Sequence, residues 1–286
     1  MRSSTRRSSS IAPTSRCRDG PEVAAIARAK RIRARSNVEW QRWGRDDPFY
    51  AVATWPGRDR GGSNPWTPDD FYTLGHSYWA DFRKRWADYG VDLGLAVDIG
   101  CGAGRLTRSM AADFAQVIGV DVSEEMLEVA RTHISAPNVD LRVGDGVELP
   151  VGSATVDAAF SAHVFQHFDS LALARANFSE IARVLKPGGS MMVHLPVVMR
   201  PTGVAGVLAA LAIRHRLAGL KDSFRRWRGA PSMRWLEYPR PWLLRELPPL
   251  GLVDIELVVF RTTSSGLEHT FVLARRSLAP RPGRGA

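Results

Sequence analysis

The chain has 286 residues, of which 44% are apolar and 9% aromatic, and its net charge is +10 at pH 7. This composition is typical of a soluble globular protein and excludes a collagen-like or disulfide-rich chain. The longest apolar run is half of the roughly 20 residues that a membrane-spanning helix needs. The two cysteines, Cys17 and Cys101, lie far apart, so we expect a cytoplasmic protein without a structural disulfide.

The positive charge is concentrated in three segments of the chain. Residues 1–36 carry a net charge of +8, residues 197–240 carry +7, and four arginines follow from position 275, whereas the remainder carries −9. A nucleic-acid-binding fold places its basic residues on the folded body. We therefore expect an acidic body, a disordered basic leader over 1–36 and a flexible tail over 276–286. A transit peptide is the alternative interpretation of the leader.

Residues 37–89 are expected to form a helical cap rich in aromatic side chains. They contain thirteen of the 25 aromatic residues of the chain. Thr67 before Pro68 is a typical helix start, and the apolar spacing that follows predicts a helix over 68–88. Four aromatic residues are interpreted either as core or as a cover over a ligand site, namely Phe71, Tyr72, Tyr78 and Trp79.

From residue 90 onward, short apolar segments alternate with helical patterns. This alternation predicts an α/β domain over 90–275, with a doubly wound, mostly parallel sheet and helices on both faces. The predicted strands cover 95–99, 117–120, 139–143, 156–161 and 190–195, and the predicted helices cover 105–114, 124–133 and 171–185. A helix over 242–250 and strands over 253–260 and 270–275 are expected to complete the domain.

Three glycines at alternate positions follow the first predicted strand. They are Gly100, Gly102 and Gly104, and Asp98 precedes them within the strand. Glycine suits a loop whose backbone touches a ligand, because a Cβ atom would hold the ligand away. Asp121 ends the second predicted strand, where doubly wound folds place a carboxylate against ribose hydroxyls. The glycine spacing differs from the Gly-x-Gly-x-x-Gly of dinucleotide sites.

Five elements in this order resemble the class I S-adenosylmethionine-dependent methyltransferases, in particular the bacterial group related to ubiquinone and menaquinone methyltransferases. The elements are residues 98–104, residues 119–127, residues 144–150, residues 156–167 with Ser161 and Gln166-His167, and residues 183–189. The resemblance covers residues 90–196 strongly and 241–275 more loosely. It implies a Rossmann-like sheet with an antiparallel closing strand, and S-adenosyl-L-methionine as the cofactor.

The resemblance also implies roles for the residues of the glycine loop. Gly100, Gly102 and Gly104 would wrap the methionine half of the cofactor. Asp98 would either orient the loop or meet the ammonium group of the cofactor. Asp121 would bind both ribose hydroxyls.

Further roles implied by the resemblance concern the adenine ring and the sulfonium end of the cofactor. Val122 and Met126 would enclose the adenine. Asp145 would accept a hydrogen bond from its amino group, and the amide of Gly146 would contact the ring. Ser161 would offer its backbone to the methionine moiety.

His167 is the candidate catalytic residue. Methyl transfer is an in-line displacement that depends mainly on holding the nucleophile about 3 Å from the methyl group. A general base is needed only where the nucleophile carries a proton. His167 is interpreted as that base, with hydrogen bonding inside its own loop as the alternative. His133 and His163 lack ligand-spaced partners, so no metal site is expected, and Cys101 is expected to be a small buried filler.

These observations favour an S-adenosylmethionine-dependent methyltransferase that acts on a small, hydrophobic metabolite of quinone-, polyketide- or lipid-like class, with an acidic acceptor also compatible. An RNA methyltransferase and a cofactor-binding protein without transferase activity are the alternatives. Residues 161–168 lack the Asn/Asp-Pro-Pro-Tyr element of enzymes that methylate a base amine, which disfavours nucleic acid. The acceptor atom and the oligomeric state stay open.

The basic insert over 197–240 follows the fifth predicted strand, where substrate-capping elements occur. Residues 204–228 combine an apolar stripe with arginines and lysine, a pattern that predicts an amphipathic helix. We interpret the insert as a lid over the pocket. A peripheral membrane anchor and an RNA-binding arm are the alternatives.

Overall fold

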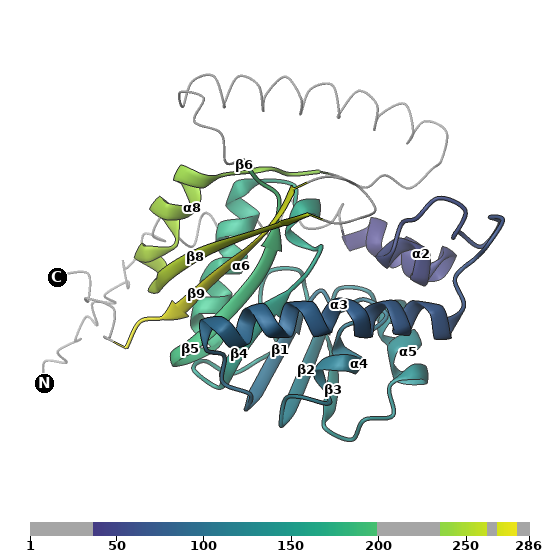
Figure 1. Ribbon diagram of the computed structural model, residues 1–286, viewed down its shortest axis with the longest axis horizontal. Helices are drawn as coiled ribbons and strands as arrows, with labels where there is room; N and C mark the ends of the chain where they lie inside the picture. The colour runs from purple at the N-terminus through teal and green to yellow at the C-terminus, as the bar shows by residue number, and fades with distance from the viewer. Residues whose placement is uncertain (1–36, 199–234, 262–267, 279–286) are drawn as a thin grey trace, which may run out of the picture.

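The computed structural model describes residues 37–198, 235–261 and 268–278 (Figure 1). The predicted leader over 1–36, nearly all of the basic insert and most of the tail lie outside these residues. None of the helices in the described ranges combines the length and the hydropathy of a membrane-spanning segment. The division of the chain into leader, cap, main domain and tail stays a prediction.

The cap region is helical, as its sequence predicts. Residues 37–46 are helical, and α2 (Pro48–Val52) and α3 (Pro68–Tyr89) follow. Thr67 caps the start of α3 by accepting a hydrogen bond from the backbone amide of its third following residue. Gly90 ends the helix in the left-handed region with a φ of 92°. The predicted helix over 68–88 is therefore confirmed to within one residue.

Seven strands form one sheet in the order β3-β2-β1-β4-β5-β9-β8. Their bounds are β1 (Leu95–Ile99), β2 (Gln116–Asp121), β3 (Val139–Val143), β4 (Val156–Ser161), β5 (Leu185–Leu195), β8 (Leu252–Arg261) and β9 (Glu268–Arg276). The first five are parallel to one another, whereas β9 runs antiparallel to both β5 and β8. The predicted doubly wound, mostly parallel α/β fold is confirmed. A separate two-stranded pair joins β6 (Val197–Val198) to β7 (Tyr238–Pro239).

Helices connect the strands. They are α4 (Thr107–Met110), α5 (Glu124–His133), α6 (Leu171–Val184) and α8 (Arg240–Glu246), together with the 3₁₀ turns η1 (Phe165–His167) and η2 (Pro248–Leu250). Ser123 caps α5 by accepting a hydrogen bond from the backbone amide of Met126.

Three predicted boundaries differ from the structure. The helix predicted over 105–114 keeps only four α-helical residues, because the chain around the glycine loop forms turns and the side chain of Asn138 binds the carbonyls of Ala111 and Phe114. The helix predicted over 242–250 is interrupted before Pro248. Strand β5 begins at Leu185 rather than Ser190, with a register shift against β4 where a break was predicted.

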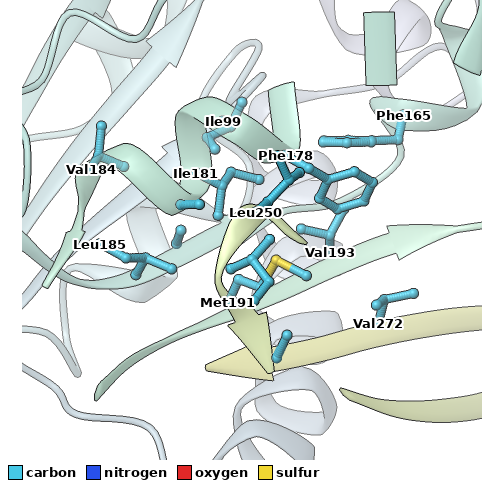
Figure 2. Packing of buried hydrophobic residues seen from close by; sticks show 14 of the residues in the cluster. Ile99, Phe165, Phe178, Ile181, Val184, Leu185, Met191, Val193, Leu250 and Val272 are labelled. Atoms are coloured by element: carbon cyan, nitrogen blue, oxygen red, sulfur yellow. The ribbon is translucent and has the colours of Figure 1, made fainter. Parts of the chain in front are cut away.

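One face of the sheet is covered by α6 and α8. Figure 2 shows this apolar cluster, in which Phe178 and Ile181 of α6 pack against Met191 and Val193 of β5. Leu250 of η2 belongs to the same cluster. Alternate residues of the strands point to this face, as the twofold period of a strand requires.

The opposite face is covered by α3, which lies across the strands in Figure 1. Trp79, Phe82 and Trp86 pack there against inward-facing residues such as Phe160 of β4. The indole Nε1 of Trp86 donates a hydrogen bond to Oγ of Ser190 at 3.0 Å. The aromatic cap therefore completes the core of the sheet and leaves its carboxyl edge to form the site.

Candidate functional site

A cavity of about 800 Å³ lies at the carboxyl edge of the parallel strands. Its wall combines the loops after β1, β2, β3 and β4 with α3, with the ends of β8 and β9, and with Asn37, Trp40 and Val52 of the cap. Open α/β sheets bind ligands at this edge. The volume is within the range of small-molecule and cofactor sites.

The glycine loop forms part of the cavity wall. Gly100 and Gly102 line the cavity with φ angles of 72° and 54°, conformations that side-chain-bearing residues rarely adopt. A Cβ atom on Gly102 would lie 2.9 Å from Cγ2 of Val52, and one on Gly100 would collide with Val164. The loop therefore presents bare backbone to the cavity.

Asp121 lines the cavity at the end of β2 and holds the glycine loop. Its Oδ2 accepts a hydrogen bond from the amide of Gly102 at 2.8 Å, and its Oδ1 accepts one from the amide of Ser123 at 2.9 Å. Burial raises the pKa of Asp121, and these amide hydrogen bonds oppose the rise. Each carboxylate oxygen keeps a second acceptor position for a ligand hydroxyl.

Asp98 is 3% exposed and lies behind the cavity wall. Its Oδ2 accepts a hydrogen bond from Oγ1 of Thr107 at 2.6 Å. Burial raises the pKa of Asp98 to about 7, and the nearby carboxylate of Asp121 adds to the rise. Of the two predicted roles, this position favours orientation of the loop over contact with a ligand ammonium.

The end of the cavity above β2 and β3 contains three of the predicted adenine-site residues. Val122, Met126 and Gly146 line it together. Asn37 of the cap faces the same wall and donates a hydrogen bond from Nδ2 to the backbone carbonyl of Asp145 at 3.1 Å.

Three further predicted residues lie behind the wall and shape it. Oδ1 of Asp145 accepts hydrogen bonds from two amides of the turn that follows, at 2.9 and 2.8 Å. Ser161 is fully buried and donates from Oγ to the carbonyl of Ile99 at 2.8 Å. Gly104 packs against Ile134 just beyond α5. The predicted ligand contacts of these residues stay predictions.

His167 lines the cavity from η1. Its ring packs edge-on against Trp40, with ring centroids 5.2 Å apart, and its Nε2 lies 3.1 Å from Nε2 of Gln166. The residue therefore faces the cavity, and it also has the local hydrogen bond that its alternative interpretation requires.

The four aromatic residues that we predicted as either core or cover divide between these roles. Tyr78 lines the cavity. Phe71, Tyr72 and Trp79 are buried in the core. Cys101 is buried as expected, and burial raises the pKa of its thiol.

The sequence interpretation missed a cluster of three histidines at the acceptor side of the sheet edge. His163 follows β4, His194 ends β5 and His269 begins β9, and one ring nitrogen from each lies within 4.8 Å of the others. The conclusion that His163 lacks ligand-spaced partners was therefore wrong, because the pairing of β5 with β9 joins positions far apart in the chain. Burial lowers the pKa of all three, that of His163 to about 3, so the rings are neutral at pH 7.

Arg105 is a second site residue that the sequence interpretation missed. Its side chain lines the cavity although the residue is 4% exposed. Its guanidinium carbon lies 5.4 Å from the ring centroid of Tyr78 and 5.8 Å from that of Phe71. Burial lowers the pKa of Arg105 to about 10, which leaves it cationic at neutral pH. An arginine directly after the glycine loop was the signal in the sequence, but the residue was interpreted only as the start of the predicted helix over 105–114.

Residues 97–193 match the family model described as "Methyltransferase domain". The chain is 39% identical over 100 residues to a demethylmenaquinone methyltransferase of Symbiobacterium thermophilum, which covers 32% of this chain and 39% of the relative. It is 36% identical over 121 residues to a ubiquinone biosynthesis O-methyltransferase of Mesorhizobium japonicum, covering 41% and 47%. The chain thus spans less than half the length of these curated relatives.

A solved structure shares the fold. The crystal structure of a SAM-dependent methyltransferase from Methanosarcina mazei superposes with a TM-score of 0.52 at 15% identity, covering 68% of this chain and 97% of that one. This match supports the order and direction of the strands described above. The sequence match over residues 97–193 includes the glycine loop.

Proposed function

Because residues 97–193 carry a methyltransferase domain, we propose that this protein transfers a methyl group from S-adenosyl-L-methionine to a small, hydrophobic acceptor of the quinone, polyketide or lipid class. The observation that carries the proposal is the glycine loop held by Asp121 at one end of a large, aromatic-lined cavity. The names of the relatives, which concern menaquinone and ubiquinone, support the acceptor class.

The residues at the β1–β3 end of the cavity fit the cofactor. The bare backbone of Gly100 and Gly102 leaves room for the methionine chain, which a Cβ atom would obstruct. The remaining acceptor positions of Asp121 suit two ribose hydroxyls. Val122 and Met126 offer apolar surfaces for the adenine ring. When bound, the cofactor supplies an electrophilic methyl group on a sulfonium.

The chain would position the acceptor, limit the access of water to the cavity and supply a general base. Cap residues such as Trp40 and Val52 line the cavity beside the loops and would limit the access of water to a bound acceptor. A cavity that holds the acceptor in line with the methyl group supplies most of the acceleration by proximity. We propose that His167 takes the proton of acceptors that carry one at neutral pH.

Incubation of the protein with labelled cofactor and a panel of demethylated quinones and phenolic polyketides tests the proposal. We expect label in at least one acceptor, and the His167→Ala variant should transfer about 10²-fold more slowly to protonated acceptors. Isothermal titration with S-adenosylhomocysteine runs in parallel. If the protein binds S-adenosylhomocysteine but transfers label to no acceptor, a binding protein without transferase activity would be favoured instead. Full turnover in the His167→Ala variant would show that His167 is not the base.

A further inference from the structure

The cavity has two chemically different ends. The sheet order puts β3, β2 and β1 on one side and β4, β5, β9 and β8 on the other. The proposed cofactor residues lie on the first side. The second, which we call the acceptor end, is lined by Tyr78, Arg105, His163, Phe260 and His269.

Arg105 carries a buried charge that its neighbours in the described structure compensate only in part. Its buried Nε has no hydrogen-bond partner there. The carboxyl group of Asp98 attracts the charge, but the hydrogen bond of that carboxyl group is with Thr107. Its contacts with Tyr78 and Phe71 are with ring faces. Buried charges in proteins are paired, because an uncompensated one is costly. A cation that lines a cavity in this state is therefore arranged for an anion from outside the chain.

The acidic residues of the cavity wall do not supply that anion. Asp81 lines the cavity from α3, but its carboxylate is paired with Arg85 at 2.9 Å. Asp121 and Glu148 follow β2 and β3 at the other end, where Asp121 accepts hydrogen bonds from two backbone amides. The charge of Arg105 is one of the causes that lower the pKa of His163, after burial, so this charge acts on the acceptor end.

The hydrogen-bond pattern of the histidines fixes the ring proton of His194. The amide of His163 donates to Nδ1 of His194 at 3.2 Å, so the proton of the neutral His194 ring lies on Nε2. This Nε2 lies 2.8 Å from Nδ1 of His269 and donates to it.

The same pattern argues against a metal ion on the three histidines. A metal bound to Nε2 of His194 would move the ring proton to Nδ1, where it would face the amide hydrogen of His163. A divalent cation would also lie close to the cationic Arg105. A positive charge beside neutral imidazole rings suits an oxyanion better than a cation.

We propose that the acceptor end is an oxyanion subsite, in which Arg105 binds an anionic oxygen group of the acceptor, such as a carboxylate or a phenolate. This inference rests on the proposed methyltransferase function and narrows its substrate class. The apolar rings of Tyr78 and Phe260 in the same wall would hold the hydrophobic body of such an acceptor.

Titration of the S-adenosylhomocysteine-bound protein with benzoate and with its neutral isostere benzamide tests the subsite. We expect benzoate to bind about tenfold or more tightly than benzamide. Arg105→Met should weaken benzoate about ten- to a hundredfold and leave benzamide and S-adenosylhomocysteine unchanged. Arg105→Lys, which keeps the charge, should retain an intermediate affinity. Arg108→Met is the matched control, because Arg108 is exposed and outside the cavity wall.

Several outcomes would overturn the subsite. Equal affinities for benzoate and benzamide would show that the subsite does not recognise an oxyanion. A loss of S-adenosylhomocysteine affinity in Arg105→Met, with 5′-methylthioadenosine binding unchanged, would assign Arg105 to the cofactor's own carboxylate. Stoichiometric Zn²⁺ binding that His194→Gln abolishes would make the cluster a metal site. Failure of the wild-type protein to bind S-adenosylhomocysteine would contradict the proposed function itself, so the two failures are distinguishable.

Discussion

The two aspartates at the ends of neighbouring strands have different surroundings, although the sequence treats them alike. Asp121 faces the cavity and shares its oxygens with backbone amides, whereas Asp98 lies behind the wall with a single hydroxyl donor. The first is placed to meet a ligand and the second to hold the turn. Substitutions at the two positions should therefore affect different properties.

Asp121→Ala should weaken S-adenosylhomocysteine binding about ten- to a hundredfold, because the variant loses charged hydrogen bonds to the ligand and releases the Gly102 amide. Isothermal titration measures the change. Asp140→Ala is the control, since Asp140 is an exposed carboxylate on the neighbouring strand β3. Unchanged affinity in Asp121→Ala would contradict the proposed cofactor site.

Asp98→Asn should change how stability depends on pH. Because the folded-state pKa of Asp98 is about 7 against an ordinary value of 3.8, the folded protein binds this proton more tightly than the unfolded chain. The associated stability is complete below about pH 4 and is lost as the pH rises towards 7. Asparagine removes this loss, so the variant should gain about 3 to 5 kcal/mol relative to wild type between pH 4 and 8. Urea denaturation at several pH values measures it, and parallel pH profiles would contradict it.

From the sequence alone, we could predict only those site residues that lie within one short motif. Gly102, Asp121 and Met126 line the cavity, as their motif implies. His194 and His269 were missed because their proximity depends on β5 pairing with β9, and they are 75 positions apart. Arg105 was missed because a helical pattern does not reveal that its first turn is buried under α3.

At the scale of elements, α3 is an integral part of the sheet's core. Three of its aromatic residues, Trp79, Phe82 and Trp86, fill the face that the later helices leave uncovered. The buried hydrogen bond from Trp86 to Ser190 joins this helix to β5, which lies 104 positions later in the chain. The cap and the sheet should consequently unfold together.

Trp86→Phe should destabilise the protein by about 1 to 3 kcal/mol, because the variant loses both buried volume and the indole hydrogen bond. A double-mutant cycle with Ser190→Ala, followed by urea denaturation, isolates the hydrogen bond. We expect a coupling of about 0.5 to 1.5 kcal/mol between the two positions. Additive effects of the two substitutions would show that the bond contributes nothing.

Element boundaries were predictable where a cap or a glycine specifies them. Thr67 and Gly90 delimit α3, and Ser123 begins α5, because these residues satisfy backbone groups locally. The helix predicted over 105–114 was too long because Asn138, from a distant turn, binds its carbonyls instead. Tertiary hydrogen bonds of this kind leave no local pattern.

At the scale of the whole molecule, strand alternation was sufficient to predict the fold class. The parallel order of the first five strands follows from helices that must cross over between them. The last two strands were predicted as a closing pair. In the sheet, β9 lies between β5 and β8, an order that the sequence does not predict. This order also brings His269 to the carboxyl edge.

The position of β9 has a consequence for how the chain folds. Strand β8 is synthesised before β9 but has no neighbour in the sheet until β9 is added, and β5 meanwhile presents an unpaired edge. Unpaired edges recruit strands from other chains, so a nascent or truncated polypeptide that lacks β9 is prone to aggregate. Strand β9 therefore both completes the cavity and protects the chain from self-association.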